Sequence, residues 1–135
     1  MLELKQISGT HIVAAPAALD KVAWPAGSIV LRFAADEALV TPPVERLALD
    51  DPHAIVAPDG GFAGAWLPAA EALAALERTC EWEVPSQRPA FAQGAVAGVP
   101  VKLWLEAERV LVVVPAPYVH DFAERFSGHD VKSTL

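Results

Sequence analysis

Apolar and polar positions alternate along several short stretches of the chain, and this alternation predicts β-strands. In residues 101–105 the odd positions are apolar and share one face, while the even positions carry Lys102 and Trp104. Residues 110–114 are apolar at every position, as is typical of a central strand covered on both faces. Further segments with strand-forming composition lie at residues 11–14, 29–34, 38–41, 53–57, 62–67 and 82–84.

Polar or glycine-containing turns separate these segments and predict three hairpins. Residues 35–37 and 106–109 are polar turns between apolar strands. Residues 59–61 read Asp-Gly-Gly, and glycine tolerates the positive φ that a tight hairpin requires. Gly64, inside the strand that follows, is a candidate β-bulge.

After two of the strands, the apolar residues recur with a helical period. Residues 68–80 predict an amphipathic helix that begins at Pro68, since the first helical position accepts a proline. Residues 119–126 predict a second helix that ends at Gly128. The expected buried faces are Ala69, Ala72, Leu73, Leu76 and Cys80 in the first helix, and Val119, Phe122, Ala123 and Phe126 in the second.

The two helical segments belong to stretches that look alike. Pro68 and Glu77 recur 47 positions later as Pro115 and Glu124, and the elements around them come in the same order. Two such units packed side by side would give one sheet with both helices on one face. We therefore predict an α+β fold with a mainly antiparallel sheet and two helices, built from two pseudo-repeated hairpin–helix units. The alternative is that the shared letters reflect only the abundance of proline and alanine.

The chain length of 135 residues corresponds to a single domain, which we place at residues 1–127. Pro16 and Pro25 interrupt residues 1–27, which we expect to form an arm over the core. Residues 81–93 are expected to form a linker that contains the short strand at 82–84, and residues 128–135 a flexible tail.

Charge and composition exclude several classes of protein. There are 10 Lys and Arg against 17 Asp and Glu, so the net charge is −7. Such a surface repels phosphate groups, which argues against nucleic acids and anionic membranes as partners. No apolar run approaches the ~18 residues that span a bilayer, and the N-terminus lacks the pattern of a signal peptide. The single cysteine, Cys80, fits a reducing compartment, and we expect a cytoplasmic protein.

Three groups of side chains could in principle carry chemistry. Asp50, Asp51 and His53 could hold a divalent metal, but Asp-Asp-Pro is also an ordinary turn and no further ligand follows at metal spacing. His120 and Glu124 could be an acid–base pair or a solvated contact on one helix face. Cys80 falls on an apolar helix face, where a thiol is a poor nucleophile. We therefore expect no catalytic or metal site. A small enzyme that uses His53 or His120 remains an alternative.

Several short motifs in the second half of the chain match a known family. Residues 88–91 read Arg-Pro-Ala-Phe, residues 97–104 read Ala-Gly-Val-Pro-Val-Lys-Leu-Trp, and residues 110–115 read Val-Leu-Val-Val-Val-Pro. Gly94 stands between the first two motifs, and Tyr118 follows the third. This series resembles the C-terminal part of the gamma subunit of heterotetrameric sarcosine oxidase, and residues 33–39 resemble an earlier strand of that family.

The resemblance implies an α+β domain related to the folate-binding domain of aminomethyltransferases. It also implies a non-catalytic accessory subunit, whose partners in the parent complex carry the flavin, dinucleotide and folate chemistry. Ala116 and Pro117 stand where the family often has Arg-Ser, so an arginine that could hold a carboxylate is missing here. No cofactor is predicted for this chain itself, and folate enters by resemblance alone.

Large aromatic residues are the remaining candidates for a binding surface, since tryptophan and tyrosine combine apolar area with one polar atom. Either they form a surface for a partner or a ligand, or the sheet and the arm bury them. We predict an accessory protein that contacts a second copy of itself or larger oxidase or aminomethyltransferase-type subunits. The alternative is a domain that binds a small folate-like planar acid. The candidate residues are Trp66, Trp82, Trp104 and Tyr118.

Overall fold

The structure, a computed structural model, describes residues 2–127 and is mixed α/β. Within these residues the chain forms seven strands, three α-helices and one short 3-10 turn, and the predicted, mainly antiparallel α+β architecture is confirmed. The predicted helix end at Gly128 and the predicted tail lie outside the described residues. The elements are β1 (Lys5–Val13), α1 (Pro16–Asp20), β2 (Ile29–Ala34), β3 (Glu37–Thr41), β4 (Ile55–Pro68), α2 (Ala69–Thr79), β5 (Ala90–Val96), β6 (Val99–Leu105), β7 (Arg109–Pro115), η1 (Ala116–Tyr118) and α3 (Val119–Phe126).

The described chain divides into two compact units, residues 2–6 with 61–127, and residues 7–60. We expected a single domain over residues 1–127, with residues 1–27 as an arm. Residues 5–13 of that segment are strand β1, which runs from one unit into the other. Within residues 2–127, no helix combines the length and the apolar character needed to cross a bilayer.

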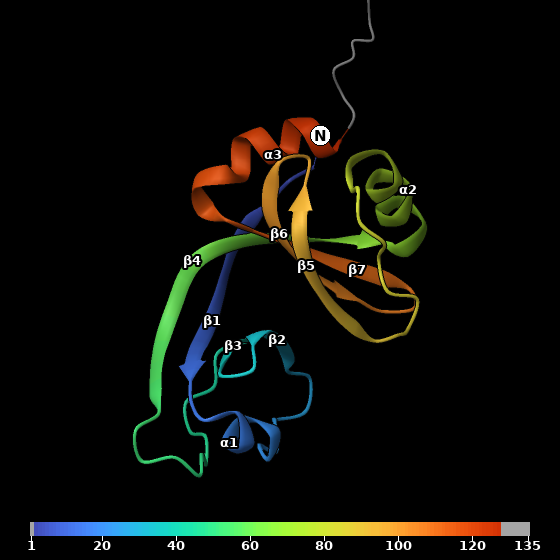
Figure 1. Cartoon of the computed structure of the whole chain (residues 1–135). Coiled ribbons are helices and arrows are strands. Elements are labelled where there is room, and N and C mark those ends of the chain that lie inside the picture. The colour runs from blue at the N-terminus through green and yellow to red at the C-terminus, as the bar shows by residue number, and fades with distance from the viewer. Residues whose placement is uncertain (1, 128–135) are drawn as a thin grey trace, which may run out of the picture. The chain divides into compact units, whose positions relative to one another are not determined.

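In the 61–127 unit, strands β4, β7, β6 and β5 lie side by side in that order, each antiparallel to its neighbour. Helices α2 and α3 pack against one face of this sheet (Figure 1). Residues 110–114 of β7 are all buried, which confirms the prediction of a central, covered strand. On the helix side the core consists of alternate strand residues, chiefly Val101, Leu103, Leu105, Val110, Val112 and Val114.

The two predicted helices of this unit are present, with one correction. In α3 the buried residues are Phe122, Ala123 and Phe126, as the period predicts. In α2 the buried face is Ala72, Ala75 and Leu76, whereas Leu73 is 39% exposed, so its predicted burial is wrong. Alanine lies on both sides of this helix, so its sequence contains two apolar stripes, and packing against β7 selects one.

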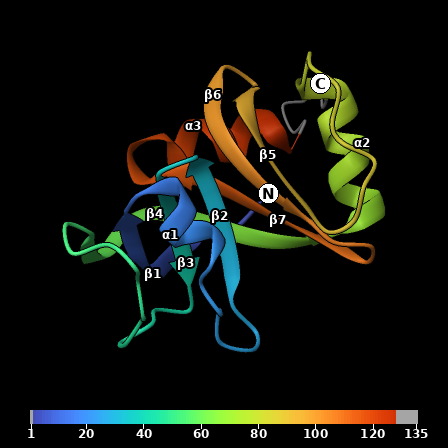
Figure 2. The ribbon, with the colours of Figure 1, turned by 60° about the horizontal axis from the view of Figure 1, so that its bottom comes forward.

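In the 7–60 unit, β3 lies between β2 and β1 in an antiparallel arrangement, and the predicted hairpin of residues 29–41 is confirmed. Figure 2 shows these strands together with α1. Ala18 and Leu19 of α1 pack with Ile12 of β1 and Val40 of β3 in a separate small core. This third helix was not predicted, because five residues are too few to show a helical period. Pro16 does not break it, because the first turn of a helix tolerates proline.

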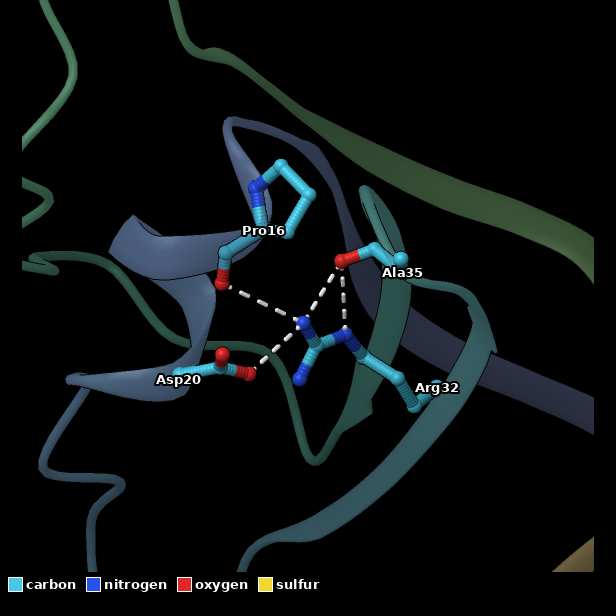
Figure 3. A network of polar contacts seen from close by, with 4 residues as sticks. All are labelled: Pro16, Asp20, Arg32 and Ala35. Atoms are coloured by element: carbon cyan, nitrogen blue, oxygen red, sulfur yellow. Dashed lines mark hydrogen bonds and ion pairs between the residues drawn. The ribbon is translucent and has the colours of Figure 1, made fainter.

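The guanidinium of Arg32 ties α1 to the β2–β3 turn (Figure 3). Its Nη2 donates to Asp20 Oδ1 at 3.0 Å and to the carbonyl of Pro16 at 3.4 Å. The same nitrogen and Nε donate to the carbonyl of Ala35, at 2.5 and 3.1 Å. A short helix with few internal hydrogen bonds thereby gains external ones.

Two predicted elements are wrong, and both errors concern strands. Residues 53–67 do not form a hairpin, because β4 continues without a turn through the Asp-Gly-Gly segment. Gly64 is not a bulge, because Ala63, Gly64 and Ala65 pair in unbroken register with β7. The glycines with positive φ in the described chain are Gly27 and Gly98, not those of the Asp-Gly-Gly segment. Residues 82–84 are not a strand either, and the strand of that region is β5.

Candidate functional site

A row of large apolar side chains crosses the sheet of the 61–127 unit on the face opposite α2 and α3. Trp66 lies opposite Leu111, Leu111 lies opposite Trp104, and Trp104 lies opposite Phe91. Residues directly opposite each other on paired strands point to the same face of the sheet. Successive residues along a strand point to opposite faces, so Leu111 lies on the face away from Val110 and the rest of the helix-side core. Within the row, Leu111 is 5% exposed and Trp66 is 37% exposed.

A chain of contacts through the β6–β7 turn links the two tryptophans of this row. The indole Nε1 of Trp104 donates to Glu106 Oε2 at 2.9 Å, and Arg109 Nε donates to Glu106 Oε1 at 2.9 Å. The guanidinium carbon of Arg109 then lies 3.6 Å from the centre of the Trp66 ring, within the range of a cation–π contact. We call these four residues the Trp66–Trp104 patch.

The β6–β7 turn supplies the two charged members of the patch. Glu106 follows β6 and Arg109 begins β7, so the turn brings them to three positions apart, and the backbone N–H of Glu106 bonds the carbonyl of Arg109 at 2.9 Å. The hydrogen bond from Arg109 lowers the pKa of Glu106, with smaller contributions from the Trp104 indole and the Arg109 charge, and partial burial opposes them. Glu106 is therefore an anion at neutral pH and holds both neighbours by charge-assisted bonds.

Of the four aromatic residues singled out from the sequence, two belong to this patch and two lie elsewhere. Trp82 packs against the helix-side core, its ring lies on Gly94, and its Nε1 donates to the carbonyl of Ala95 at 2.8 Å. Tyr118 ends η1, just before α3, and is 41% exposed. Trp82 is therefore a partly buried residue at the edge of the helix-side core.

Arg109 and Glu106 were not predicted as members of a site, because both fall in a polar turn, where charged residues are common. The available signal was a glutamate two residues after a strand tryptophan, followed three positions later by an arginine. Such a turn can bring the arginine close to an aromatic ring. The ring that Arg109 contacts is Trp66, about forty residues earlier in the chain, so sequence proximity does not reveal the contact.

The other candidate groups form local contacts. Asp51 accepts hydrogen bonds from the backbone N–H of Ala15 at 2.8 Å and of His53 at 2.9 Å, and these bonds lower the pKa of Asp51. In the part of the chain from Leu2 to Ser127, no cluster of three or more His, Cys, Asp or Glu could hold a metal ion. His120 and Glu124 lie 3.9 Å apart with both side chains largely exposed, which makes them a solvated pair.

A shallow hollow of about 250 Å³ lies beside the patch. Arg88, Pro89, Trp104, Glu106 and Ala107 line it. The Nη1 of Arg88 donates to the carbonyls of Pro85 and Gln87, both at 2.7 Å, so this guanidinium is held in place. The hollow therefore brings an indole and a guanidinium together next to the patch.

No protein-family model matches the sequence, and no curated protein matches it significantly. What the chain does is therefore inferred from the geometry of its described residues and from the resemblance given above.

Proposed function

We propose that this chain is a non-catalytic accessory protein, similar to the gamma subunit of sarcosine oxidase, which binds a protein partner through the Trp66–Trp104 patch. One observation carries the proposal, the Arg109 guanidinium held between the Trp66 ring and the Glu106 carboxylate. The partner is either a second copy of the chain or a larger subunit of an oxidase or aminomethyltransferase-type complex.

The residue types of the patch support this role. Tryptophan and arginine are the residues most enriched among those that dominate binding energy at protein interfaces. Trp66 is one of five large apolar residues with high exposure in the described chain, and the Arg109 side chain is 52% exposed. Because Glu106 fixes Arg109 and Trp104 before any partner arrives, less side-chain entropy is lost on binding.

The pairing of β4 with β7 also supports an origin by internal duplication, which the repeated spacing of 47 residues predicts. Ala65 lies opposite Val112, and these residues are 47 positions apart, the same offset that relates Pro68 to Pro115. In this one pair, equivalent positions of the two copies face each other, and the remaining pairs are arranged symmetrically about it. The repeated unit that we propose is strand–proline–helix, without the hairpin in its first copy.

Photo-crosslinking from the edge of the patch tests the proposed role. p-Benzoylphenylalanine replaces Ala107, an exposed residue of the turn, in a tagged full-length chain within its native cell, and Leu73 on α2 is replaced in the control. We expect one discrete adduct from position 107 and none of that mass from position 73. An adduct of twice the chain mass identifies a second copy, and another mass identifies a separate subunit.

Variants of the patch make this test specific. In the position-107 background, Trp66→Ala and Arg109→Ala should each abolish the adduct, because they remove the ring and the cation that would be buried on binding. Leu73→Ala in the same background should leave it unchanged. The proposal is overturned if position 107 gives no discrete adduct, or if the adduct survives both patch variants.

A second candidate function is the binding of a small folate-like planar acid, which the hollow beside Trp104 favours. A planar ring could stack on the exposed part of the Trp104 indole while its carboxylate meets Arg88. Folate should then quench the tryptophan fluorescence, and Trp104→Phe should remove this quenching while Trp24→Phe retains it. Free N-acetyltryptophanamide corrects for the absorption of light by folate. Absence of corrected quenching at millimolar folate excludes this candidate.

A further inference from the structure

A second hollow, of about 430 Å³, lies in the unit that contains residues 61–127, and Trp66 is the one patch member among its lining residues. Its apolar lining includes Leu67 of β4, Ala75 of α2 and Phe126 of α3. Its size falls within the ~300–1,000 Å³ that small-molecule sites occupy. The strand and both helices that form it belong to the same packed core, so the lining is built on rigid elements.

Three charged and exposed residues stand at this hollow, namely Glu3, Glu71 and Arg78. Among residues 2–127, no ion pair joins Arg78 to either glutamate or to any other carboxylate. Opposite charges that share a hollow without pairing leave room between them for a ligand that meets both.

Two features fix the backbone positions that carry these charges. Glu71 and Arg78 lie seven positions apart on α2, which is two helical turns or about 10 Å along one side of the helix. The backbone N–H of Leu2 donates to Ser127 Oγ at 3.0 Å, which ties the segment carrying Glu3 to the end of α3. The hydroxyl of Ser127 in turn donates to the carbonyl of Ala123 at 2.8 Å.

We propose that this hollow binds a small zwitterion with an apolar body. The anionic group of the ligand meets the guanidinium of Arg78, its cationic group lies at the acidic side formed by Glu71 and Glu3, and its apolar body covers Phe126 and Leu67. A ligand with one charge would gain an ion pair on only one side of the hollow. The hollow shares Trp66 with the patch but neither of its charged residues, so variants of Arg78 and Glu71 test this inference separately from the accessory function.

Three commercially available probes of one shape test the inference on the full-length chain. They are 4-(aminomethyl)benzoate, which is zwitterionic, 4-methylbenzoate, which is anionic, and benzylamine, which is cationic. Binding is followed by NMR titration of the protein. We expect the zwitterion to bind at least ten-fold more tightly than either singly charged probe and to shift the resonances of Ala75 and Phe126.

Charge-neutralising variants then locate the site. Arg78→Gln should weaken binding of the zwitterion at least ten-fold, and Glu71→Gln combined with Glu3→Gln should bring its affinity down to that of 4-methylbenzoate. The controls are Glu77→Gln, at an exposed position of α2 outside the hollow, and Arg46→Gln in the 7–60 unit, and both should keep the full affinity. Equal affinities for the three probes, or a zwitterion affinity that Arg78→Gln leaves unchanged, would overturn the inference.

Discussion

The Arg109 guanidinium carbon lies 3.6 Å from the centre of the Trp66 ring, although the two residues are 43 positions apart in the chain. The contact exists because β4 and β7 pair in a register that sets Arg109 beside Pro68, two positions from Trp66 along the same face. Glu106 completes the geometry, since it holds Nε of Arg109 at 2.9 Å. Strand pairing and one turn thus build an exposed surface feature of fixed shape.

Replacing Arg109 should have a small effect on stability. Arg109→Gln removes an exposed cation–π contact and a partly exposed ion pair, so the free energy of unfolding should fall by about 0.5–1 kcal/mol. Arg109→Lys keeps the charge but not the planar group or the Nε donor, and should lose nearly as much. Urea denaturation followed by circular dichroism measures both. Arg46→Gln is the control, and a loss in that variant equal to that of Arg109→Gln would contradict the assignment.

The stability of the protein should depend on the protonation of Glu106 at acidic pH. Its pKa is lower in the folded chain than the ordinary glutamate value of about 4.3, chiefly because Arg109 donates a hydrogen bond to it. A lowered folded pKa means that the stabilisation is fully present above the unfolded pKa. It is lost as the pH falls through the folded pKa.

Glu106→Gln should therefore flatten the fall in stability below about pH 4.5, because glutamine does not titrate. The measurement is the urea midpoint of the wild type and the variant between pH 3 and 7. Glu108→Gln, in the same turn, controls for the loss of one acidic charge. A wild type and a Glu106→Gln variant with parallel pH profiles would show that the contact contributes nothing to folding.

Much of the fold could be predicted because some segments have a single interpretation. Residues 110–114 are apolar throughout, rich in valine and followed by Pro115, which favours a covered strand, and Phe122 and Phe126 recur at one helix face. Strand β4 could not be predicted as one element, because its Asp-Gly-Gly sequence is a turn signal, yet the strand continues through it and pairs with β7 from Phe62 onward. Strand β5 contains alanine, glutamine and glycine, which have low strand propensity, and it forms because β6 offers a partner along its whole length.

The candidate site was half predictable for a related reason. Alternation in β6 places Trp104 on the face opposite Leu103, and the structure confirms this placement. That Trp66 shares the row depends on the register between β4 and β7, which no local pattern of the sequence specifies. The fate of Trp82 depends on a contact with Gly94 twelve positions later, and such contacts cannot be derived from spacing alone.

Truncating Phe122 should destabilise the protein strongly. Its ring is fully buried and stacks on Phe126 with the ring centres 4.9 Å apart. Phe122→Ala should cost about 3–5 kcal/mol, and Phe122→Leu, which keeps most of the volume, less than about 1.5 kcal/mol. Leu73→Ala, on the exposed side of α2, should stay within about 0.5 kcal/mol of the wild type. Chemical denaturation measures the stability of the three variants. A loss for Leu73→Ala as large as that for Phe122→Ala would show that Leu73 belongs to the buried face of α2.

Gly94 and Trp82 should be energetically coupled. A Cβ at position 94 would lie 2.7 Å from the Trp82 indole, and the ring is held there by its bond to Ala95 and by the core around it. Gly94→Ala should therefore displace the ring, cost about 1–3 kcal/mol and change the near-ultraviolet circular dichroism. In the Trp82→Ala background the same glycine substitution has no ring to displace, so its cost should fall to a few tenths of a kcal/mol. A double-mutant cycle from urea denaturation gives the coupling, and additive costs would mean that the indole does not occupy the space above Gly94.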